Sequence, residues 1–306
     1  MNRFAAIDVG TNSVLLLVAD RQPDGRFVAV EERAEITRLG KGVDQSKRLA
    51  PEAIKMTLDV LERYAKDARE LGAEQIVASA TSAARDASNG HEFLDGAKTR
   101  AGLTLEIISG DEEARLSFSS AQADFGDSQP LMVLDIGGGS TEFIFGDAHG
   151  AITFRKSFDV GAVRLTERIL RNDPPTPAEL QSLELSLATT FATLPPPPRG
   201  AKLVAVAGTA TTICSVARRI EPYDPAVVHG AVVKRDELEA TVTRLASLPT
   251  DLRKTLPGLQ PKRADVIVAG GFILRAALRA VGVDEVTISD RGLSWGLLAD
   301  RFGAKK

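Results

Sequence analysis

The chain has 306 residues and a formal net charge of −3, with 43% hydrophobic and 26% charged residues. This length is typical of about two domains, and the composition is that of a globular protein with a substantial core. The near-neutral charge gives no argument for binding nucleic acid or a membrane, and the single cysteine, Cys214, excludes an internal disulfide.

The first twenty residues are apolar enough to suggest a signal peptide. Asp8 and Asn12 interrupt the apolar run, however, and no small-residue cleavage pattern follows. No stretch reaches the ~18 uninterrupted apolar residues that a membrane span needs. The sequence therefore predicts a cytoplasmic protein without a membrane segment.

Two similar motifs lie 127 residues apart, since Asp8, Gly10 and Ser13 are repeated as Asp135, Gly137 and Ser140. Each motif consists of an apolar run, an aspartate, a glycine-containing turn and a second apolar run. This order predicts a β-hairpin with a tight, polar tip. Two such hairpins one domain length apart indicate a duplicated architecture with a cleft between the halves.

The segments between and after the hairpins alternate between strand-like and helix-like patterns. In chain order, the predicted elements are a helix over 51–71, a strand over 75–80, a polar loop entering a helix over 81–89, a strand over 103–108, a helix over 112–123, a domain junction at 126–130, helices over 161–171 and 177–193, a strand from 203 to a turn at Gly208, a helix over 210–219, a second strand-to-glycine segment over 264–271, and a loop with a final helix over 290–300. This alternation predicts an α/β protein, and the hairpins make its sheets mixed.

The second hairpin carries two acids that face one another. If its turn is centred on Gly138 and Gly139, then Asp135 lies directly opposite Glu142. Two opposed carboxylates repel one another unless a cation lies between them, and hard oxygen ligands suit Mg²⁺. The first hairpin has Leu15 at the position of Glu142, so it supplies one carboxylate, Asp8. The alternative is that both aspartates only close turns.

Small and neutral residues beside these acids could bind a phosphate. Glycines 137–139 expose backbone amides, and the side chains of Asn12, Ser13 and Ser140 add neutral donors. Gly208 and Thr209 resemble a further phosphate cradle at a helix start. Thr209 could equally be only the N-cap of that helix.

The segment from Ser109 to Arg115 holds two glutamates with different expected roles. Ser109 and Glu112 have the spacing of a capping box, which gives Glu112 a structural role. Glu113 is either an ordinary acid of a first helical turn or a general base for water, and spacing alone favours the former. Arg85 and Asn89 lie four residues apart in a predicted helix and could share a face that holds a phosphate.

These segments together resemble the exopolyphosphatase / guanosine pentaphosphate phosphatase family. The matching segments span nearly the whole chain and are 8–13, 80–85, 108–116, 134–142, 207–209 and 289–293. The family's glycine pair before the threonine is Ala207-Gly208 here. The resemblance implies an actin-like fold of two ribonuclease-H-like domains with mixed sheets and an interdomain cleft. The first domain would span 1–127 and be completed by a C-terminal helix over 291–304, and the second would span 128–290.

The resemblance also implies an activity and its residues. The activity is release of the terminal phosphate of inorganic polyphosphate, or conversion of guanosine pentaphosphate to tetraphosphate. Glu113 would activate water. Asp8, Asp135 and Glu142 would hold Mg²⁺, with Mn²⁺ as the alternative metal. The phosphate contacts would be Asn12, Ser13, Arg85, Gly137, Gly138, Gly139, Ser140, Gly208 and Thr209.

Two other functions are compatible with these motifs. An ATP-dependent kinase or ATPase of the same superfold would use Gly270-Gly271 for an adenosine. A non-catalytic sensor would bind guanosine penta- or tetraphosphate without hydrolysis. By analogy with the family we expect a homodimer. Longer family members carry additional C-terminal helical domains that this sequence lacks, so the resemblance does not carry over their processivity or their preference for long chains.

Overall fold

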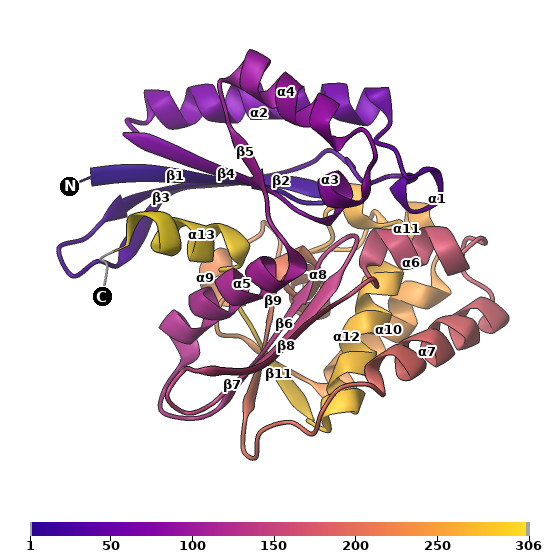
Figure 1. Cartoon of the computed structure of the whole chain (residues 1–306). Helices are drawn as coiled ribbons and strands as arrows, with labels where there is room; N and C mark the ends of the chain where they lie inside the picture. The colour runs from indigo at the N-terminus through magenta and orange to yellow at the C-terminus, as the bar shows by residue number, and fades with distance from the viewer. Residues whose placement is uncertain (1, 304–306) are drawn as a thin grey trace. The chain divides into compact units, whose positions relative to one another are not determined.

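The computed structural model describes residues 2–303 of the chain. It divides into two compact units, the first formed by Met1–Ser120 with Leu293–Lys306 and the second by Ala121–Gly292. Figure 1 shows the order of the elements along the chain. Each unit is built on its own mixed sheet, so each is described by itself.

The first unit contains a five-stranded sheet in the order β3-β2-β1-β4-β5. Strands β1, β2 and β3 form an antiparallel meander, and β4 and β5 continue the sheet in parallel from β1. The strands span Asn2–Val9 (β1), Ser13–Arg21 (β2), Phe27–Ile36 (β3), Gln75–Ala80 (β4) and Leu105–Ile107 (β5).

Alternate residues of β1 face opposite sides of this sheet, as the two-residue period of a strand requires. Ala5, Ile7 and Val9 share a core with the helices α2 (Pro51–Glu70) and α4 (Gly90–Ala101). Phe4 and Ala6 share another core with α13 (Leu293–Phe302) and with Leu116 of α5 (Gly110–Phe125). The sheet is therefore covered by helices on both faces. Two short helices, α1 (Val43–Ser46) and α3 (Ser82–Asp86), complete the unit.

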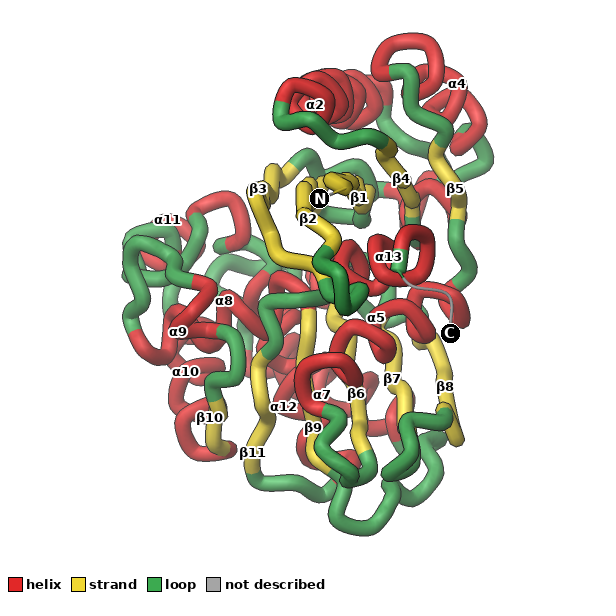
Figure 2. Tube along the Cα trace, turned by 90° about the vertical axis from the view of Figure 1, so that its left-hand side faces the viewer, coloured by secondary structure: helices red, strands yellow, loops and turns green. Residues whose placement is uncertain are grey.

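The second unit contains a six-stranded sheet in the order β10-β11-β9-β6-β7-β8, and Figure 2 shows these strands in yellow in that order. Strands β6, β7 and β8 are an antiparallel meander, and β9 and β11 run parallel to β6. The strands span Leu131–Ile136 (β6), Thr141–Gly146 (β7), Ile152–Phe158 (β8), Lys202–Val206 (β9), Val232–Lys234 (β10) and Glu285–Ile288 (β11).

The largest core of the protein lies in the second unit and joins this sheet to its helices. Met132, Leu134, Phe143 and Phe145 from β6 and β7 belong to it, together with residues from α7, α8, α10 and α12. The helices span Ala162–Ile169 (α6), Pro177–Phe191 (α7), Ala207–Arg218 (α8), Pro225–Val228 (α9), Arg235–Ser247 (α10), Thr250–Arg253 (α11) and Ile267–Val281 (α12), with a 3₁₀ turn at Pro261–Arg263 (η1).

Both predicted hairpins are present, and so is the predicted pairing across them. Asp135 pairs with Glu142 and Asp8 with Leu15. The helix predicted over 51–71 is α2, which starts at a proline and is followed by Gly72 with a φ of +87°. The final helix spans Leu293–Phe302, and residue 304 of the predicted helix lies outside the described residues.

The predicted strand over 264–271 is wrong, because this segment enters helix α12 at Ile267. Its apolar run is buried all around the helix, and periodicity alone does not distinguish such a run from a buried strand. The two glycines allow close helix packing. A Cβ at Gly270 would lie 2.6 Å from Thr209 Cγ2, and one at Gly271 would lie 2.9 Å from Val242 Cγ2.

Strands β3, β8, β10 and β11 were not predicted from the sequence. Within residues 2–303, no helix combines the length and the apolar character that crossing a bilayer would require.

Candidate functional site

Two buried acids face each other at the end of the β6–β7 hairpin in the second unit. Asp135 is the penultimate residue of β6, and its register partner in β7 is Glu142. Their exposed fractions are 5% and 0%. Ser157 of β8 donates a hydrogen bond of 2.6 Å from its Oγ to Glu142 Oε1. The second unit thus holds a pair of carboxylates in a fixed position, as the hairpin register predicts.

The glycine turn that joins these strands is held through its carbonyl groups. The carbonyl of Gly137 accepts from the amide of Ala162 (3.0 Å), and the carbonyl of Gly138 accepts from the amides of Val163 (2.9 Å) and Arg164 (3.1 Å). The carbonyl of Gly139 accepts from Arg164 Nε at 2.6 Å. The amides of the first turn of α6, which would otherwise lack helical partners, therefore bind two successive carbonyls of the turn, and the Arg164 side chain binds the third.

This arrangement determines where the amides of the turn point. Among residues 2–303, cis peptide bonds occur only before Pro174 and Pro222, so the turn peptides are trans. In a planar trans peptide the C=O and N–H groups point in opposite directions. Because the carbonyls of residues 137–139 point at α6, the amides of Gly138, Gly139 and Ser140 point away from it. Three successive N–H groups on one side are an arrangement that can bind an anion, and these three are here called the amide cradle (residues 138–140).

The first hairpin repeats this backbone construction in the other unit. The Gly10 amide donates to the Ser13 carbonyl at 2.9 Å, and the Gly137 amide donates to the Ser140 carbonyl at 3.0 Å. The carbonyls of Thr11 and Asn12 accept from amides of the 37–40 segment at 2.8–3.1 Å. By the same geometry, the amides of Asn12 and Ser13 point away from that segment. Beside them lies the single buried carboxylate of this tip, Asp8.

Glu113 lies in the first turn of α5 with an exposed fraction of 7%. Arg85, at the end of α3, places Nη1 3.7 Å from Glu113 Oε2 and donates from the same nitrogen to the Ile108 carbonyl at 2.8 Å. The start of α3 is bound to the first hairpin tip by a 2.8 Å hydrogen bond between Ser82 Oγ and Thr11 Oγ1. The first unit therefore brings Arg85 and Glu113 together, and α3 connects them to the hairpin tip.

The neighbouring Glu112 has the structural role that its spacing predicts, but only half of the capping box forms. Its amide donates to Ser109 Oγ at 3.1 Å. Its carboxylate binds Arg115 instead of returning to Ser109, with Oε2–Nε at 2.8 Å and Oε1–Nη2 at 2.7 Å. These bonds from Arg115 lower the pKa of Glu112 below its ordinary value.

Asn89 does not share a helix face with Arg85, so that prediction is wrong. Helix α3 ends at Asp86, and Ala87 has an extended backbone with φ −91° and ψ 130°. The buried Asn89 side chain accepts from the Leu49 amide (2.8 Å) and donates to the Leu49 carbonyl (3.1 Å). Its role is to hold the 47–51 segment.

Gly208 and Thr209 lie in the first turn of helix α8, which begins at Ala207 directly after β9. Thr209 is not the N-cap of this helix, because that position belongs to Val206, which has no side-chain cap. Ala207 has a φ of +67°, a left-handed conformation that normally favours glycine. A Cβ at Gly208 would lie 2.3 Å from Arg263 Nη1, so this guanidinium is packed against the start of α8. Nothing in the sequence around Arg263 indicates this contact, because the two residues lie 55 positions apart.

Within the described residues 2–303, no three His, Cys, Asp or Glu side chains gather as a ready-made metal site. The second unit instead offers the Asp135–Glu142 pair, and the first unit offers Asp8. Mg²⁺ commonly binds through one or two carboxylates and completes its shell with water and phosphate oxygens. The donor type and number in the second unit fit this mode of binding.

The family comparison covers nearly the whole chain. The model of the family described as "Ppx/GppA phosphatase family" matches residues 17–304. Exopolyphosphatase 2 of Mycobacterium tuberculosis is 37% identical over 322 aligned positions, which cover 99% of each chain. A bifunctional 3-dehydroquinate synthase/phosphatase of Fusobacterium nucleatum is 32% identical over 97% of this chain and 46% of its own length.

Solved structures of the family agree with the architecture. The Aquifex aeolicus member of the Ppx/GppA family superimposes with a TM-score of 0.82 and 33% identity, covering 98% of this chain and 97% of its own. An exopolyphosphatase from Cytophaga hutchinsonii superimposes with a TM-score of 0.88 and 25% identity, covering 98% of each chain. The sequence, the two mixed sheets and these neighbours agree: the chain belongs to the Ppx/GppA phosphatase family and has its actin-like fold.

Proposed function

We propose that the protein is a metal-assisted exopolyphosphatase that releases the terminal phosphate of inorganic polyphosphate. The observation that carries this proposal is the amide cradle of residues 138–140 beside the opposed acids Asp135 and Glu142. An amide cradle binds an anion, whereas two buried acids repel one unless a cation lies between them. A phosphate chain that arrives with a divalent cation satisfies both features.

The terminal phosphate would be bound mostly by backbone amides. The cradle, with the amides of Asn12 and Ser13 in the first hairpin, offers donors without positive side chains. The start of α8 at Gly208 and Thr209 adds a further anion-binding position, and Arg263 lies against it. Such donors act on the equatorial phosphate oxygens, where charge accumulates during phosphoryl transfer.

The residues proposed to hold the metal are Asp135 and Glu142, with Asp8 as a further ligand. Mg²⁺ bound there would supply positive charge to the phosphate oxygens, and Mn²⁺ would fit the same oxygen donors. Ser157 orients Glu142 through its 2.6 Å hydrogen bond. The protein's own contribution is to hold two carboxylates in register so that they do not have to be ordered when the cation binds.

Glu113 is the proposed general base. The water oxygen forms a bond to the terminal phosphorus while a water proton passes to the Glu113 carboxylate. The bond from that phosphorus to the bridging oxygen breaks, and the shortened chain leaves with its electron pair. Arg85, 3.7 Å from Glu113, holds the carboxylate in place and offers its guanidinium to a phosphate oxygen.

The kinase alternative loses its proposed nucleotide site. It requires Gly270 and Gly271 to approach an adenosine, but both glycines are buried in α12 and packed against Thr209 and Val242. The sensor alternative would leave Glu113 without a function, since binding alone needs no base.

Phosphate release from short polyphosphate, long polyphosphate, guanosine pentaphosphate and ATP, measured side by side with Mg²⁺, tests the proposal. We expect release from polyphosphate. Phosphate release from guanosine pentaphosphate alone would mean that the proposed substrate is wrong and that the proposed site acts on guanosine pentaphosphate instead. Turnover of ATP alone would support a kinase or ATPase, and binding without any release would support the sensor.

A further inference from the structure

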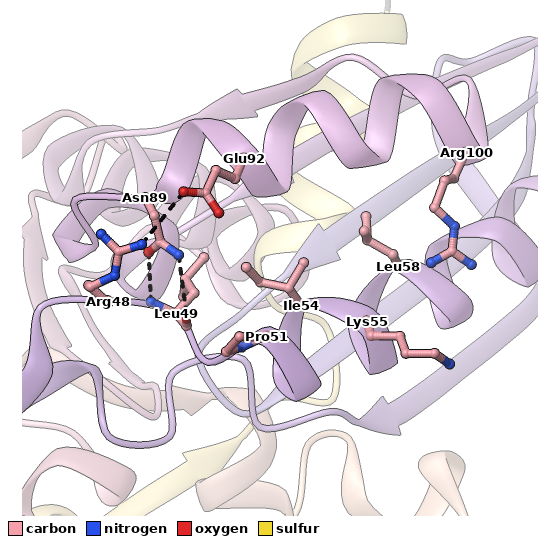
Figure 3. Close-up of a pocket in the computed structure, with 9 residues that line it drawn as sticks. All are labelled: Arg48, Leu49, Pro51, Ile54, Lys55, Leu58, Asn89, Glu92 and Arg100. Carbon is pink, nitrogen blue, oxygen red and sulfur yellow. Dashed lines mark hydrogen bonds and ion pairs between the residues drawn. The ribbon is translucent and has the colours of Figure 1, made fainter.

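A pocket of about 380 Å³ lies in the first unit, and its lining includes none of the residues proposed above to bind phosphate or metal or to act as the base. Figure 3 shows it between helices α2 and α4 and the segment that leads into α2. Its apolar floor is formed by Leu49, Ile54 and Leu58. Pockets of this size hold small organic ligands, and an apolar floor favours a ligand with a ring or a hydrocarbon body.

The rim of this pocket carries cations, one of which can contact an anionic group on that ligand. Three cations line it, Arg48, Lys55 and Arg100, and the only lining acid is Glu92. Lys55 and Arg100 are hydrogen-bonded to acids outside the lining, at 3.0 Å or less.

Arg48 is held much more loosely than the other two cations. Its Nη2 lies 3.6 Å from Glu92 Oε1, and both side chains are more than half exposed, at 61% and 53%. Exposed pairs of this kind contribute about 0–1 kcal/mol, so a ligand anion can compete with Glu92 for the guanidinium. Arg48 is therefore the expected anion contact, with the apolar body of the ligand over Ile54 and Leu58.

The wall of the pocket is connected to the proposed base through α3. Asn89, in the lining, is bound to the backbone of Leu49, and the Ser88 amide donates to the Lys47 carbonyl at 2.8 Å. Gly90 is so close to α3 that a Cβ there would lie 2.4 Å from the Ala84 carbonyl oxygen. The next residue, Arg85, is the one that contacts Glu113. A ligand that shifts the 47–49 segment would therefore also shift residues 84–90, and with them the position of Arg85 relative to Glu113.

We propose that this pocket binds a small organic anion with an apolar body and that occupancy alters hydrolysis through the 82–90 segment. The binding claim stands on the pocket alone, whereas its effect on hydrolysis rests on the proposed function. The probe for the test is 8-anilinonaphthalene-1-sulfonate, which combines an aromatic body with a sulfonate and fluoresces when it leaves water.

Binding is measured by titrating the full-length protein with the probe, which is excited directly. Ile54→Trp fills the pocket and should abolish saturable binding. Met56→Trp is the matched control, because Met56 lies on the same helix, is 49% exposed and does not line the pocket. Equal binding by both variants overturns the proposal.

A second pair of variants keeps the test valid if Ile54→Trp does not fold. Arg48→Glu should raise the Kd of the probe about tenfold, since it replaces attraction at the anion contact with repulsion. Lys66→Glu is the control, because it also replaces a cation by an acid. The Lys66 side chain is 72% exposed on α2 and does not line the pocket, so this variant should bind the probe like wild type. Equal weakening in both variants would mean that only net charge matters and would overturn the site.

The effect on hydrolysis is measured as phosphate release from polyphosphate with and without the probe. We expect KM or kcat to change at least twofold in wild type and Met56→Trp but not in Ile54→Trp. Saturable binding with no change in phosphate release overturns the connection through α3. Because the fluorescence titration needs no turnover, failure of the proposed activity and failure of the pocket site give different results.

Discussion

The two hairpin tips share the hydrogen bond that closes the turn and differ in the residue that lies opposite the aspartate. The hydrogen bond that closes the turn is 2.9 Å at Gly10 and 3.0 Å at Gly137, and the turn carbonyls are bound from behind in both. The register partner of Asp8 is Leu15, whereas the partner of Asp135 is Glu142. The first tip therefore offers amides and one acid, and the second offers amides and an acid pair.

The supports behind the tips also differ. An irregular segment, residues 37–40, binds the first tip, while the N-terminus of α6 binds the second, with the buried Arg164 on the last carbonyl. A helix start is stiffer than an irregular segment because the carbonyls of its first turn are hydrogen-bonded to the amides of the next turn. We infer that the backbone of the second tip is the more rigid of the two.

The largest expected effect lies outside both tips. Glu113→Gln keeps the shape of the side chain and removes its ability to accept a proton, so kcat should fall about 10³-fold while polyphosphate still binds. Single-turnover phosphate release and a separate binding titration measure the two quantities. The matched control is Glu112→Gln, since Glu112 is adjacent but bound to Arg115. If both variants keep near wild-type kcat, Glu113 is not the base.

The support behind each tip can be tested with one added methyl group. Gly161→Ala would place a Cβ 2.4 Å from the Gly138 carbonyl oxygen, so the backbone of the second tip must move. We expect about a 10²-fold loss in kcat/KM, the size typical of a misplaced binding group. Gly40→Ala, behind the first tip, meets the end of the Thr11 side chain at 2.3 Å and should cost less. Equal losses of kcat/KM in the two variants would contradict the proposal that the second tip is held more rigidly than the first.

A smaller effect is expected for the cation at the start of α8. Arg263→Gln removes the guanidinium that lies against Gly208 and should raise KM for polyphosphate about tenfold, with kcat changed less. Steady-state kinetics at two salt concentrations provide the measurement. Arg244→Gln, on α10 away from Gly208, serves as the control. An unchanged KM for Arg263→Gln would mean that this arginine packs against α8 and does not bind the substrate.

The smallest expected effect is a gain in stability. Ala207 has a φ of +67°, and this conformation costs a residue with a Cβ about 1–2 kcal/mol. Ala207→Gly removes that cost but gains freedom in the unfolded chain, so the net stabilisation should be about 0.5–1 kcal/mol. A thermal melt followed by circular dichroism measures it. A lower melting temperature than wild type would show that the Ala207 conformation carries no strain.

Patterns local in the sequence predicted the α/β class, the mixed sheets and the two hairpin tips, whereas the actin-like fold was implied by the family resemblance. The hairpins, their register and the α2 helix follow from residue spacing, so they could be read directly. Contacts between distant segments could not be read, such as Arg263 against Gly208 or Arg164 on the Gly139 carbonyl. The 264–271 segment was misassigned because a helix buried on all sides has no polar face to reveal its period. Asn89 was misplaced because α3 ends after a single turn.

The central claim is that the Asp135–Glu142 pair holds the divalent cation on which hydrolysis depends. Glu142→Gln tests it most directly, because the amide keeps the shape and can still accept from Ser157 while the charge is lost. Phosphate release from polyphosphate is measured over a range of Mg²⁺ concentrations, with Glu112→Gln as the control. We predict that half-maximal activity of Glu142→Gln requires about tenfold more Mg²⁺ than wild type or the control. A Mg²⁺ dependence identical to that of wild type would contradict the account.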